Sequence, residues 1–242
     1  MRIPRIFLEA SLSAESTVNL SDDAITHIIR VLRLKAGASL IVFNGEGGEY
    51  MAVLDSTDRR HATITISRHL NRNPESPLRV QLAQGISKGE RMDYTIQKSV
   101  ELGISRIIPI FTQRSVVNLQ GQRLHKRRQH WQGVVQSACE QCGRNLLPEV
   151  ASPQQFDEWI TTTDSGMKLL LDPESSMHIN DLHTPDGVIT LLVGPEGGLG
   201  NSEREQARDC GFTGISLGPR ILRTETAALT ALAVMHSLWG DI

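Results

Sequence analysis

The chain has 242 residues, more than the ~100–150 typical of one domain, so either two domains or one large α/β unit is expected. Hydrophobic residues make up 39% of the chain and charged residues 21%, and no apolar run approaches the ~20 residues that cross a bilayer, which excludes a membrane-spanning protein. The net charge of −2 hides a segregation, because residues 79–144 carry 11 Lys and Arg against 4 Asp and Glu, whereas residues 145–242 carry 5 against 14.

The N-terminal part of the chain is predicted to be a small β-rich domain, a barrel in form, over residues 1–72. Strands are predicted over residues 40–43, 49–54 and 62–67. Residues 44–48 contain the glycines that a hairpin or short loop needs. Ser21 is predicted to begin a helix, because Asp22 and Asp23 follow it in the first turn. No apolar stretch of signal-peptide length precedes these elements, so we expect a cytoplasmic protein.

Residues 71–77 are polar, contain two prolines and form the best candidate linker. From residue 78 onward, short apolar runs alternate with segments of helical periodicity, which indicates a second, α/β domain over residues 78–242 with a mostly parallel sheet covered by helices. Its strands are predicted over residues 80–84, 107–111, 169–171, 189–193 and 215–217.

Capping patterns mark the helices of this second domain. Ser87 with Glu90, and Ser202 with Glu205, have the spacing of a capping box. The first of these helices is predicted to bury Met92, Ile96 and Val100 and to stop at Gly103, and the second to stop at Gly211. The last helix, after Thr224, carries small residues on more than one face, which suggests close packing on two sides and a subunit contact. These residues are Ala227, Ala228, Ala231 and Ala233.

The basic middle of the chain has two interpretations. No carboxylate occurs between Leu102 and Cys139, while the run RLHKRRQHW contains Arg123, Lys126 and Arg127. Such a run is found on surfaces that bind a polyanion, but for the run alone the solvated side of an ordinary amphipathic helix is the better interpretation.

Two loops rich in Gly and Pro are candidate ligand sites. Residues 194–200, GPEGGLG, follow an apolar strand but match neither a P-loop nor a dinucleotide-binding fingerprint, so either a ligand bound through the backbone or a tight turn would explain them. Residues 217–226 follow the next predicted strand, with Arg223 and Glu225 at a helix start. We expect the two loops at the carboxyl ends of neighbouring strands, which is where an open α/β sheet binds its ligand. A helix cap with an exposed ion pair would give the second pattern too.

Metal and hydrolase chemistry have little support. Cys139 and Cys142 form a single CxxC without a second ligand pair, so thiols that are buried or on a helix face are the better interpretation. With Cys210 they make an odd, sparse set that fits reduced thiols rather than disulfides. Neither GxSxG nor HExxH occurs in the chain.

Six segments in order resemble the 16S ribosomal RNA uridine-N3 methyltransferases of the SPOUT superfamily: RVLRLKAG (30–37), FNGEGGEY (43–50), QGISKGERMDYTIQKSVELG (84–103), SACEQCGRN (137–145), LLVGPEGGLG (191–200) and LGPRILRTETAALTA (217–231). The resemblance implies an N-terminal PUA-like β-barrel for RNA binding and a C-terminal α/β domain with a deep trefoil knot. It also implies a homodimer with the last helix at its interface. The family more often has Ser or Thr where Gly200 and Asn201 stand, and Ser202 is expected to take over that capping role.

The resemblance further implies that the protein binds S-adenosylmethionine, largely through backbone atoms. The residues so assigned are Leu171, Gly194, Glu196, Gly197, Gly198, Leu217, Gly218, Ile221 and Leu222. Apolar walls and amide partners suit an adenine and an uncharged ribose, which explains glycines without a lysine.

Methylation of uracil N3 requires the loss of its proton, for which Glu225 and Glu196 are the candidate acceptors, and Arg223 is the candidate for stabilising charge on the uracil oxygens. RNA phosphates would be bound by Arg30, Arg33, Lys35, Lys88, Arg91, Arg123, Lys126, Arg127 and Arg128. The expected partner is 16S rRNA within the small ribosomal subunit, since the overall charge favours a shaped particle over free RNA. The alternatives are a non-catalytic RNA-binding or assembly factor and, with less support, a nucleotide-dependent oxidoreductase.

Overall fold

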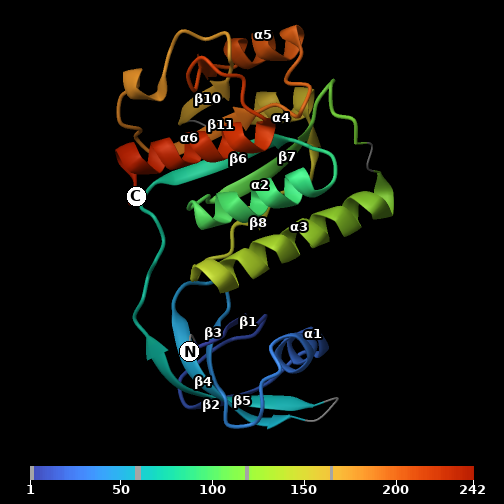
Figure 1. The fold of residues 1–242 in the computed structure, drawn as a ribbon, viewed down its shortest axis with the longest axis vertical. Helices are drawn as coiled ribbons and strands as arrows, with labels where there is room; N and C mark the ends of the chain where they lie inside the picture. Colours follow the sequence, from blue (N-terminus) through green and yellow to red (C-terminus); the bar gives the residue numbers. More distant parts are fainter. Residues whose placement is uncertain (1–2, 58–60, 118–119, 164–165) are drawn as a thin grey trace. The chain divides into compact units, whose positions relative to one another are not determined.

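The structure, a computed structural model, describes residues 3–57, 61–117, 120–163 and 166–242 (Figure 1). These residues form two compact units. The first comprises Met1–Glu75 together with Cys139–Leu147, and the second comprises Ser76–Ala138 and Pro148–Ile242. The segment Cys139–Leu147, which the sequence analysis assigned to the second domain, therefore belongs to the first unit.

The first unit contains a five-stranded sheet of order β1-β3-β4-β5-β2. Its strands are β1 (Arg5–Phe7), β2 (Ser16–Asn19), β3 (Ser39–Phe43), β4 (Glu49–Thr57) and β5 (Ala62–Leu70). The pair β1–β3 is parallel, and the other pairs are antiparallel. Helix α1 (Asp22–Ile25) continues as a π-helical segment, Thr26–Val31, which buries Ile28 in the core beside Leu40 and Ile64.

The three strands predicted for this unit are confirmed as β3, β4 and β5, and the helix predicted to begin at Ser21 is confirmed as α1. The Ser21 hydroxyl accepts a hydrogen bond from the Ala24 N–H at 3.3 Å, as expected of a helix cap. Strands β1 and β2 were not predicted, because three or four residues are too few to display a period of two.

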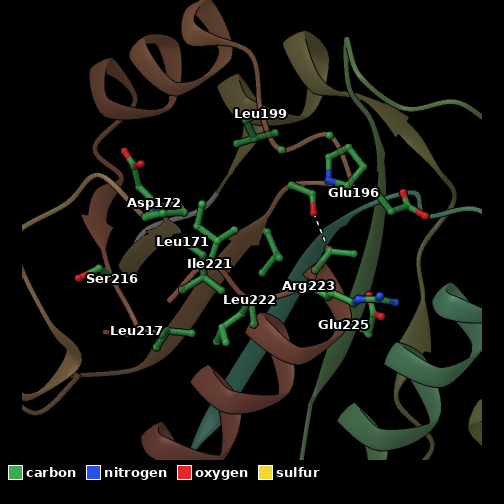
Figure 2. Close-up of a pocket in the computed structure, with 18 of the residues that line it drawn as sticks. Leu171, Asp172, Glu196, Leu199, Ser216, Leu217, Ile221, Leu222, Arg223 and Glu225 are labelled. Carbon is green, nitrogen blue, oxygen red and sulfur yellow. Dashed lines mark hydrogen bonds between the residues drawn. The ribbon is translucent and has the colours of Figure 1, made fainter. Parts of the chain in front are cut away.

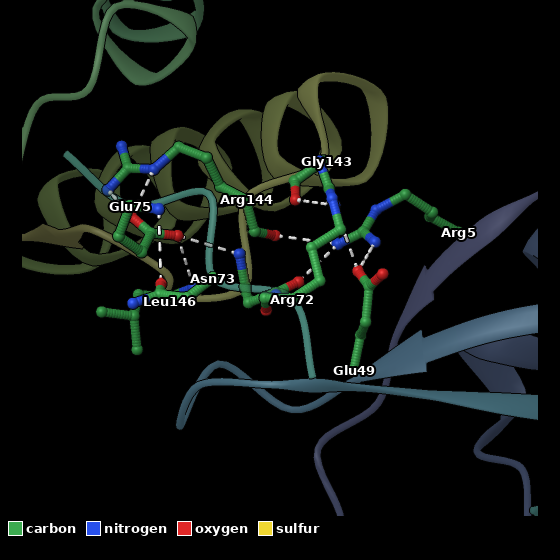
Figure 3. Close-up of polar contacts among 9 residues, drawn as sticks. Arg5, Glu49, Arg72, Asn73, Glu75, Gly143, Arg144 and Leu146 are labelled. Atoms are coloured by element: carbon green, nitrogen blue, oxygen red, sulfur yellow. Dashed lines mark hydrogen bonds and ion pairs between the residues drawn. The ribbon is translucent and has the colours of Figure 1, made fainter. Parts of the chain in front are cut away.

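Polar contacts hold the segment Cys139–Leu147 in the first unit (Figure 3). Arg5 pairs with Glu49 and also donates to the Arg144 carbonyl at 3.0 Å and to Asn145 Oδ1 at 2.8 Å. Glu75 accepts from the Arg144 guanidinium at 2.6 Å and from the backbone N–H of Asn145 at 2.9 Å. The charged groups are largely buried, and each has a partner of opposite charge, as the burial of a charge requires.

The second unit contains a parallel sheet of order β12-β10-β11-β6-β7-β8, with β9 also beside β7. Its strands are β6 (Arg79–Gly85), β7 (Arg106–Phe111), β8 (Glu149–Val150), β9 (Gln154–Gln155), β10 (Met167–Leu171), β11 (Val188–Val193) and β12 (Thr213–Ile215). The predicted mostly parallel sheet is confirmed. The last predicted strand, 215–217, is displaced: β12 ends at Ile215, which leaves Leu217 in the following loop.

Helices cover this sheet. They are α2 (Glu90–Glu101), α3 (Gly121–Cys142), α4 (Phe156–Thr162), α5 (Asn201–Asp209) and α6 (Thr224–Trp239), with a 3-10 turn at Ile179–Asp181. Helices α4 and α5 share a core with Leu170 and Leu192 of the sheet, while α2 and α6 pack against each other in front of the strands in Figure 1. No helix in the described part of the chain is long and apolar enough to cross a membrane.

Both predicted capping boxes are wrong by two residues. Helix α2 begins after Gly89, and the buried Ser87 hydroxyl lies 3.5 Å from the Gly85 carbonyl, to which it donates. Helix α5 begins after Gly200, whose N–H donates to Glu203 at 2.7 Å, so Ser202 does not cap it. The stripe of Met92, Ile96 and Val100 is buried as predicted, and Gly103 and Gly211 end the two helices with φ of +87° each.

Helix α6 buries Ala228 and Ala231 within the chain, while Ala227 and Ala233 remain half-buried. Near its end, Leu238 is 47% exposed. Small and apolar side chains thus remain partly uncovered on this helix, and a subunit contact there stays a prediction.

Candidate functional site

A cavity of about 640 Å³ opens at the carboxyl ends of β10, β11 and β12. All nine residues that the resemblance assigned to the cofactor line this cavity, as do Arg223 and Glu225. Strand β10 lies between β11 and β12, so the two Gly/Pro loops follow strands that are not adjacent, contrary to the sequence analysis. This order brings the end of β10, with Leu171 and Asp172, into the site between the loops.

The loop after β11 requires glycine at particular positions. A Cβ atom on Gly194 would lie 2.8 Å from the backbone nitrogen of Leu199, and Gly198 has a φ of +68°. The Gly198 N–H donates to the Pro195 carbonyl at 2.8 Å, which closes a tight turn. The expected sharp turn is therefore present, and it faces the cavity.

Glu196 lies at the rim of the cavity and is held by Arg91 of helix α2 and by Lys88 just before that helix. Its Oε1 accepts hydrogen bonds from the Lys88 N–H and from Arg91 Nη1, both at 2.9 Å. Partial burial acts to raise the pKa of Glu196, but backbone hydrogen bonds from its own N–H and from Lys88, together with Arg91, outweigh it, and the pKa is lowered. Glu196 is thus a poor proton acceptor and a good anchor for the loop.

Arg91 and Arg114 hold the same loop from two segments of the second unit. Arg91 binds the Glu196 side chain, and Arg114 Nη1 donates to the Gly197 carbonyl at 2.9 Å. The sequence analysis assigned Arg91 to RNA and did not single out Arg114 for the site. Nothing in the sequence distinguishes these arginines from other exposed ones.

Arg223 and Glu225 stand at the start of α6. Arg223 is the N-cap residue and is exposed, whereas Glu225 is half-buried in the first turn. Glu225 Oε2 is a buried atom that receives no hydrogen bond from the described residues. In Figure 2, Arg223, Glu225 and Glu196 lie on one side of the view, with the apolar side chains of Leu171, Ile221 and Leu222 between them and Asp172. The cavity thus has an apolar centre and a charged side.

Asp172 is a site residue that the sequence analysis missed. Its side chain is fully buried at the end of β10 and accepts from Arg208 at 2.6 Å and from Arg204 at 3.4 Å. Both arginines belong to α5, so this carboxylate ties that helix to one wall of the cavity. The available signal was a carboxylate directly after an apolar strand, LLLD.

Gln84 and Thr224 were also missed. Gln84 is fully buried at the end of β6, and its Nε2 donates to Thr224 Oγ1 at 2.9 Å. Thr224 in turn donates to the Gly194 carbonyl at 2.6 Å. A polar residue at the end of the predicted strand 80–84 is the only signal that the sequence offered for Gln84.

The loop before α6 completes the apolar wall. Gly218 has a φ of +92°, and Ile221 is 87% exposed despite lining the cavity. Leu217 and Leu222 are half-buried beside it. Three large apolar side chains around one opening can contact a flat apolar ligand such as a nucleobase.

The residues predicted to bind RNA fall into three groups. Arg30, Arg33 and Lys35 are exposed on the first unit, and Arg123, Lys126 and Arg127 are exposed on α3 of the second unit. Lys88 and Arg91 lie at the rim of the cavity. Arg128 differs from these, because its Nε donates to the Val150 carbonyl at 2.8 Å and its Nη2 lies 3.6 Å from Glu149.

The three cysteines of the chain are free thiols. Cys139 is buried, which raises the pKa of its thiol to about 12, and Cys142 is half-buried on the same helix. All three cysteines are free, as the sequence analysis expected of buried or helix-face thiols. Among the described residues, no group of three or more His, Cys, Asp or Glu side chains is placed to hold a metal ion.

Comparison with known proteins gives consistent matches. Residues 74–236 match the family described as RNA methyltransferase domain, and residues 20–67 match the RNA methyltransferase PUA domain. The ribosomal RNA small subunit methyltransferase E of Buchnera aphidicola is 36% identical, with 100% of this chain and 98% of that protein aligned.

Two solved structures share the whole fold. A Legionella pneumophila protein in complex with S-adenosylmethionine has a TM-score of 0.97 at 38% identity. The ribosomal RNA small subunit methyltransferase E from Neisseria gonorrhoeae, bound to S-adenosylmethionine, has a TM-score of 0.94 at 40% identity. Both comparisons cover 100% of each chain.

Proposed function

The chain belongs to the RNA methyltransferase family, and on this premise we propose that it methylates N3 of a specific uridine in 16S rRNA with S-adenosylmethionine as methyl donor. The observation that carries the proposal is one cavity that joins the three strand-end loops and has a charged side next to an apolar centre. The relatives named ribosomal RNA small subunit methyltransferase E support the choice of RNA. The choice of uridine N3 rests on the motifs of the chain.

The cavity fits the proposed cofactor. Gly194 cannot carry a side chain without meeting the backbone at Leu199, so the loop folds tightly on itself where it lines the cavity with Gly197 and Gly198. Leu171, Leu217 and Leu222 offer apolar contacts for an adenine ring. When bound, S-adenosylmethionine supplies a methyl group made electrophilic by its sulfonium sulfur.

The chain's own residues then have separate tasks. Glu225 takes the proton from uracil N3, and its buried Oε2, to which no described residue donates a hydrogen bond, is the accepting atom. Arg223 stabilises the negative charge that develops on the uracil carbonyl oxygens. Glu196 holds the glycine loop in place through Lys88 and Arg91. Positioning of the base by the cavity walls accounts for the remaining rate gain.

The proposal includes the domains and the assembly. Residues 1–72 form a PUA-like barrel that binds RNA, with Arg30, Arg33 and Lys35 on phosphates. Residues 78–242, apart from the segment Cys139–Leu147 that lies in the first unit, form the methyltransferase domain with its trefoil knot. The five-stranded sheet and the PUA match support the first. The hydrogen bond between the start of α6 and the loop after β11 supports the second. The protein acts as a homodimer through α6 on 16S rRNA within the small ribosomal subunit.

The test is mass spectrometry of 16S rRNA fragments after incubation of the protein with small subunits from a strain that lacks its gene. With S-adenosylmethionine, one uridine fragment should gain one methyl mass, and chromatography of the nucleosides should identify 3-methyluridine. Free 16S rRNA serves as the substrate control. Cofactor binding without a methyl gain would point to another RNA, and the absence of both would favour a non-catalytic RNA-binding factor.

A further inference from the structure

We propose that Gln84 and Thr224 are positioning residues, which set the distance between the glycine loop and the start of α6 and thereby align Glu225 with the methyl donor. This inference rests on the proposed function. Neither side chain is needed to contact the substrate, and both act through the residues that they hold.

The orientation of the Gln84 amide follows from its neighbours. Its nitrogen faces three acceptors, namely Thr224 Oγ1 at 2.9 Å, the Gly85 carbonyl at 3.0 Å and the Gly194 carbonyl at 3.4 Å. An oxygen in that place would meet two carbonyl oxygens, so the Nε2 group must occupy it. The amide therefore presents both N–H bonds to the junction of β6, the glycine loop and α6.

Thr224 completes the connection. Its hydroxyl donates to the Gly194 carbonyl at 2.6 Å and accepts from Gln84, so the hydroxyl hydrogen has one direction left. Gly194 begins the glycine loop, and Thr224 precedes Glu225 directly. Two hydrogen bonds thus couple the position of the loop to the position of the candidate proton acceptor.

The surroundings leave little room for adjustment. A Cβ atom on Gly85 would lie 2.5 Å from the backbone nitrogen of Pro195, so the loop packs directly on the end of β6. Thr224 is buried and Gln84 is fully buried, which excludes competing water from the two hydrogen bonds.

The stability of the fold does not explain why residue 84 is a glutamine. Its Oε1 is buried and accepts no hydrogen bond from the described residues. A buried acceptor without a partner destabilises a fold, and an apolar side chain of similar shape would avoid this. The presence of glutamine here is explained by the two N–H groups that it directs at Thr224 and the loop.

Misplacement of reacting groups by about 1 Å can lower a rate by about 10²-fold. We therefore expect Thr224→Val, which keeps the shape and removes the hydroxyl, to lower kcat by ~10- to 10²-fold. The dissociation constant of S-adenosylmethionine and the KM for small subunits should change less than about threefold, because the walls of the cavity remain. Thr224→Ser should restore most of kcat, and Gln84→Met should resemble Thr224→Val.

The experiment measures kcat and KM on small subunits, S-adenosylmethionine binding by calorimetry, and Tm for each variant. Thr161→Val, at an exposed position of α4 outside the cavity lining, is the matched control. A kcat of Thr224→Val within threefold of wild type, or no recovery in Thr224→Ser, would overturn the inference. Should Thr224→Val fail to fold, the same criteria apply to Gln84→Met. A wild-type protein that binds no S-adenosylmethionine would overturn the proposed function itself and the inference with it.

Discussion

The carboxylate of Glu196 and the guanidinium of Arg91 form an ion pair at 2.9 Å between the glycine loop and α2. The same Glu196 oxygen accepts the Lys88 N–H, so this carboxylate is already committed to two donors. Glu225, in contrast, keeps one buried oxygen to which no described residue donates. The two carboxylates that the sequence offered as proton acceptors therefore differ in what they are free to do.

Glu225→Gln should lower the rate of a single turnover by ~10²–10⁴, the usual contribution of general base catalysis. Binding of S-adenosylmethionine should persist, because the substitution keeps the size of the side chain. Rapid-quench methylation of small subunits measures the rate, and Glu205→Gln, exposed on α5, is the control. A loss below ~10-fold would remove Glu225 as the base.

Glu196→Gln should act on the loop rather than on the proton. We expect weaker cofactor binding and a rate loss of no more than ~10-fold, well below that of Glu225→Gln. Since the pKa of Glu196 is lowered from its usual 4.5, the stabilising effect of its ionised form is present above pH 4.5 and is lost as the pH falls through the lowered value. The difference in Tm between wild type and Glu196→Gln should therefore be constant at neutral pH and shrink in acid. A difference that grows in acid would contradict the assignment.

The first unit should depend strongly on Glu75. This carboxylate is 11% exposed and accepts from Arg144 and from the backbone N–H groups of Asn145 and Leu146. Glu75→Ala should lower the free energy of unfolding by ~3–5 kcal/mol, because it leaves the Arg144 charge with fewer partners in a largely buried position. Chemical denaturation measures this free energy.

The control for Glu75 is Glu149→Gln in the second unit. Glu149 pairs with Arg106 at 3.2 Å, but both side chains are more than 40% exposed. Exposed pairs contribute ~0–1 kcal/mol, so this variant should change stability by no more than that. Equal losses in the two variants would mean that burial of the Glu75 network is not what stabilises the first unit.

Much of the fold could be predicted, because it depends on local pattern. Apolar runs located β6, β7, β10 and β11, and the Gly/Pro loops located most of the cavity lining. The two predicted capping boxes were wrong although Ser87 and Ser202 have the right spacing. The Ser87 hydroxyl donates to the Gly85 carbonyl at the end of β6, and the Ser202 hydroxyl accepts from Gln113, so neither caps its helix. Gln84, Thr224 and Asp172 were missed for a related reason: their partners lie 30 to 140 residues away in sequence, so their role exists only in the assembled sheet.

The basic side chains should differ in what they contribute to RNA affinity. Each phosphate contact makes the negative slope of log K against log salt concentration steeper by ~0.7–0.9. Arg127 is exposed on α3, so Arg127→Ala should make this slope less steep by about that amount. Arg128→Ala is the matched control, because the Arg128 guanidinium is engaged by the Val150 carbonyl and Glu149. It should lower Tm and leave the salt slope nearly unchanged. Filter binding to small subunits at several salt concentrations measures the slopes, and an affinity that rises with salt would contradict phosphate contacts altogether.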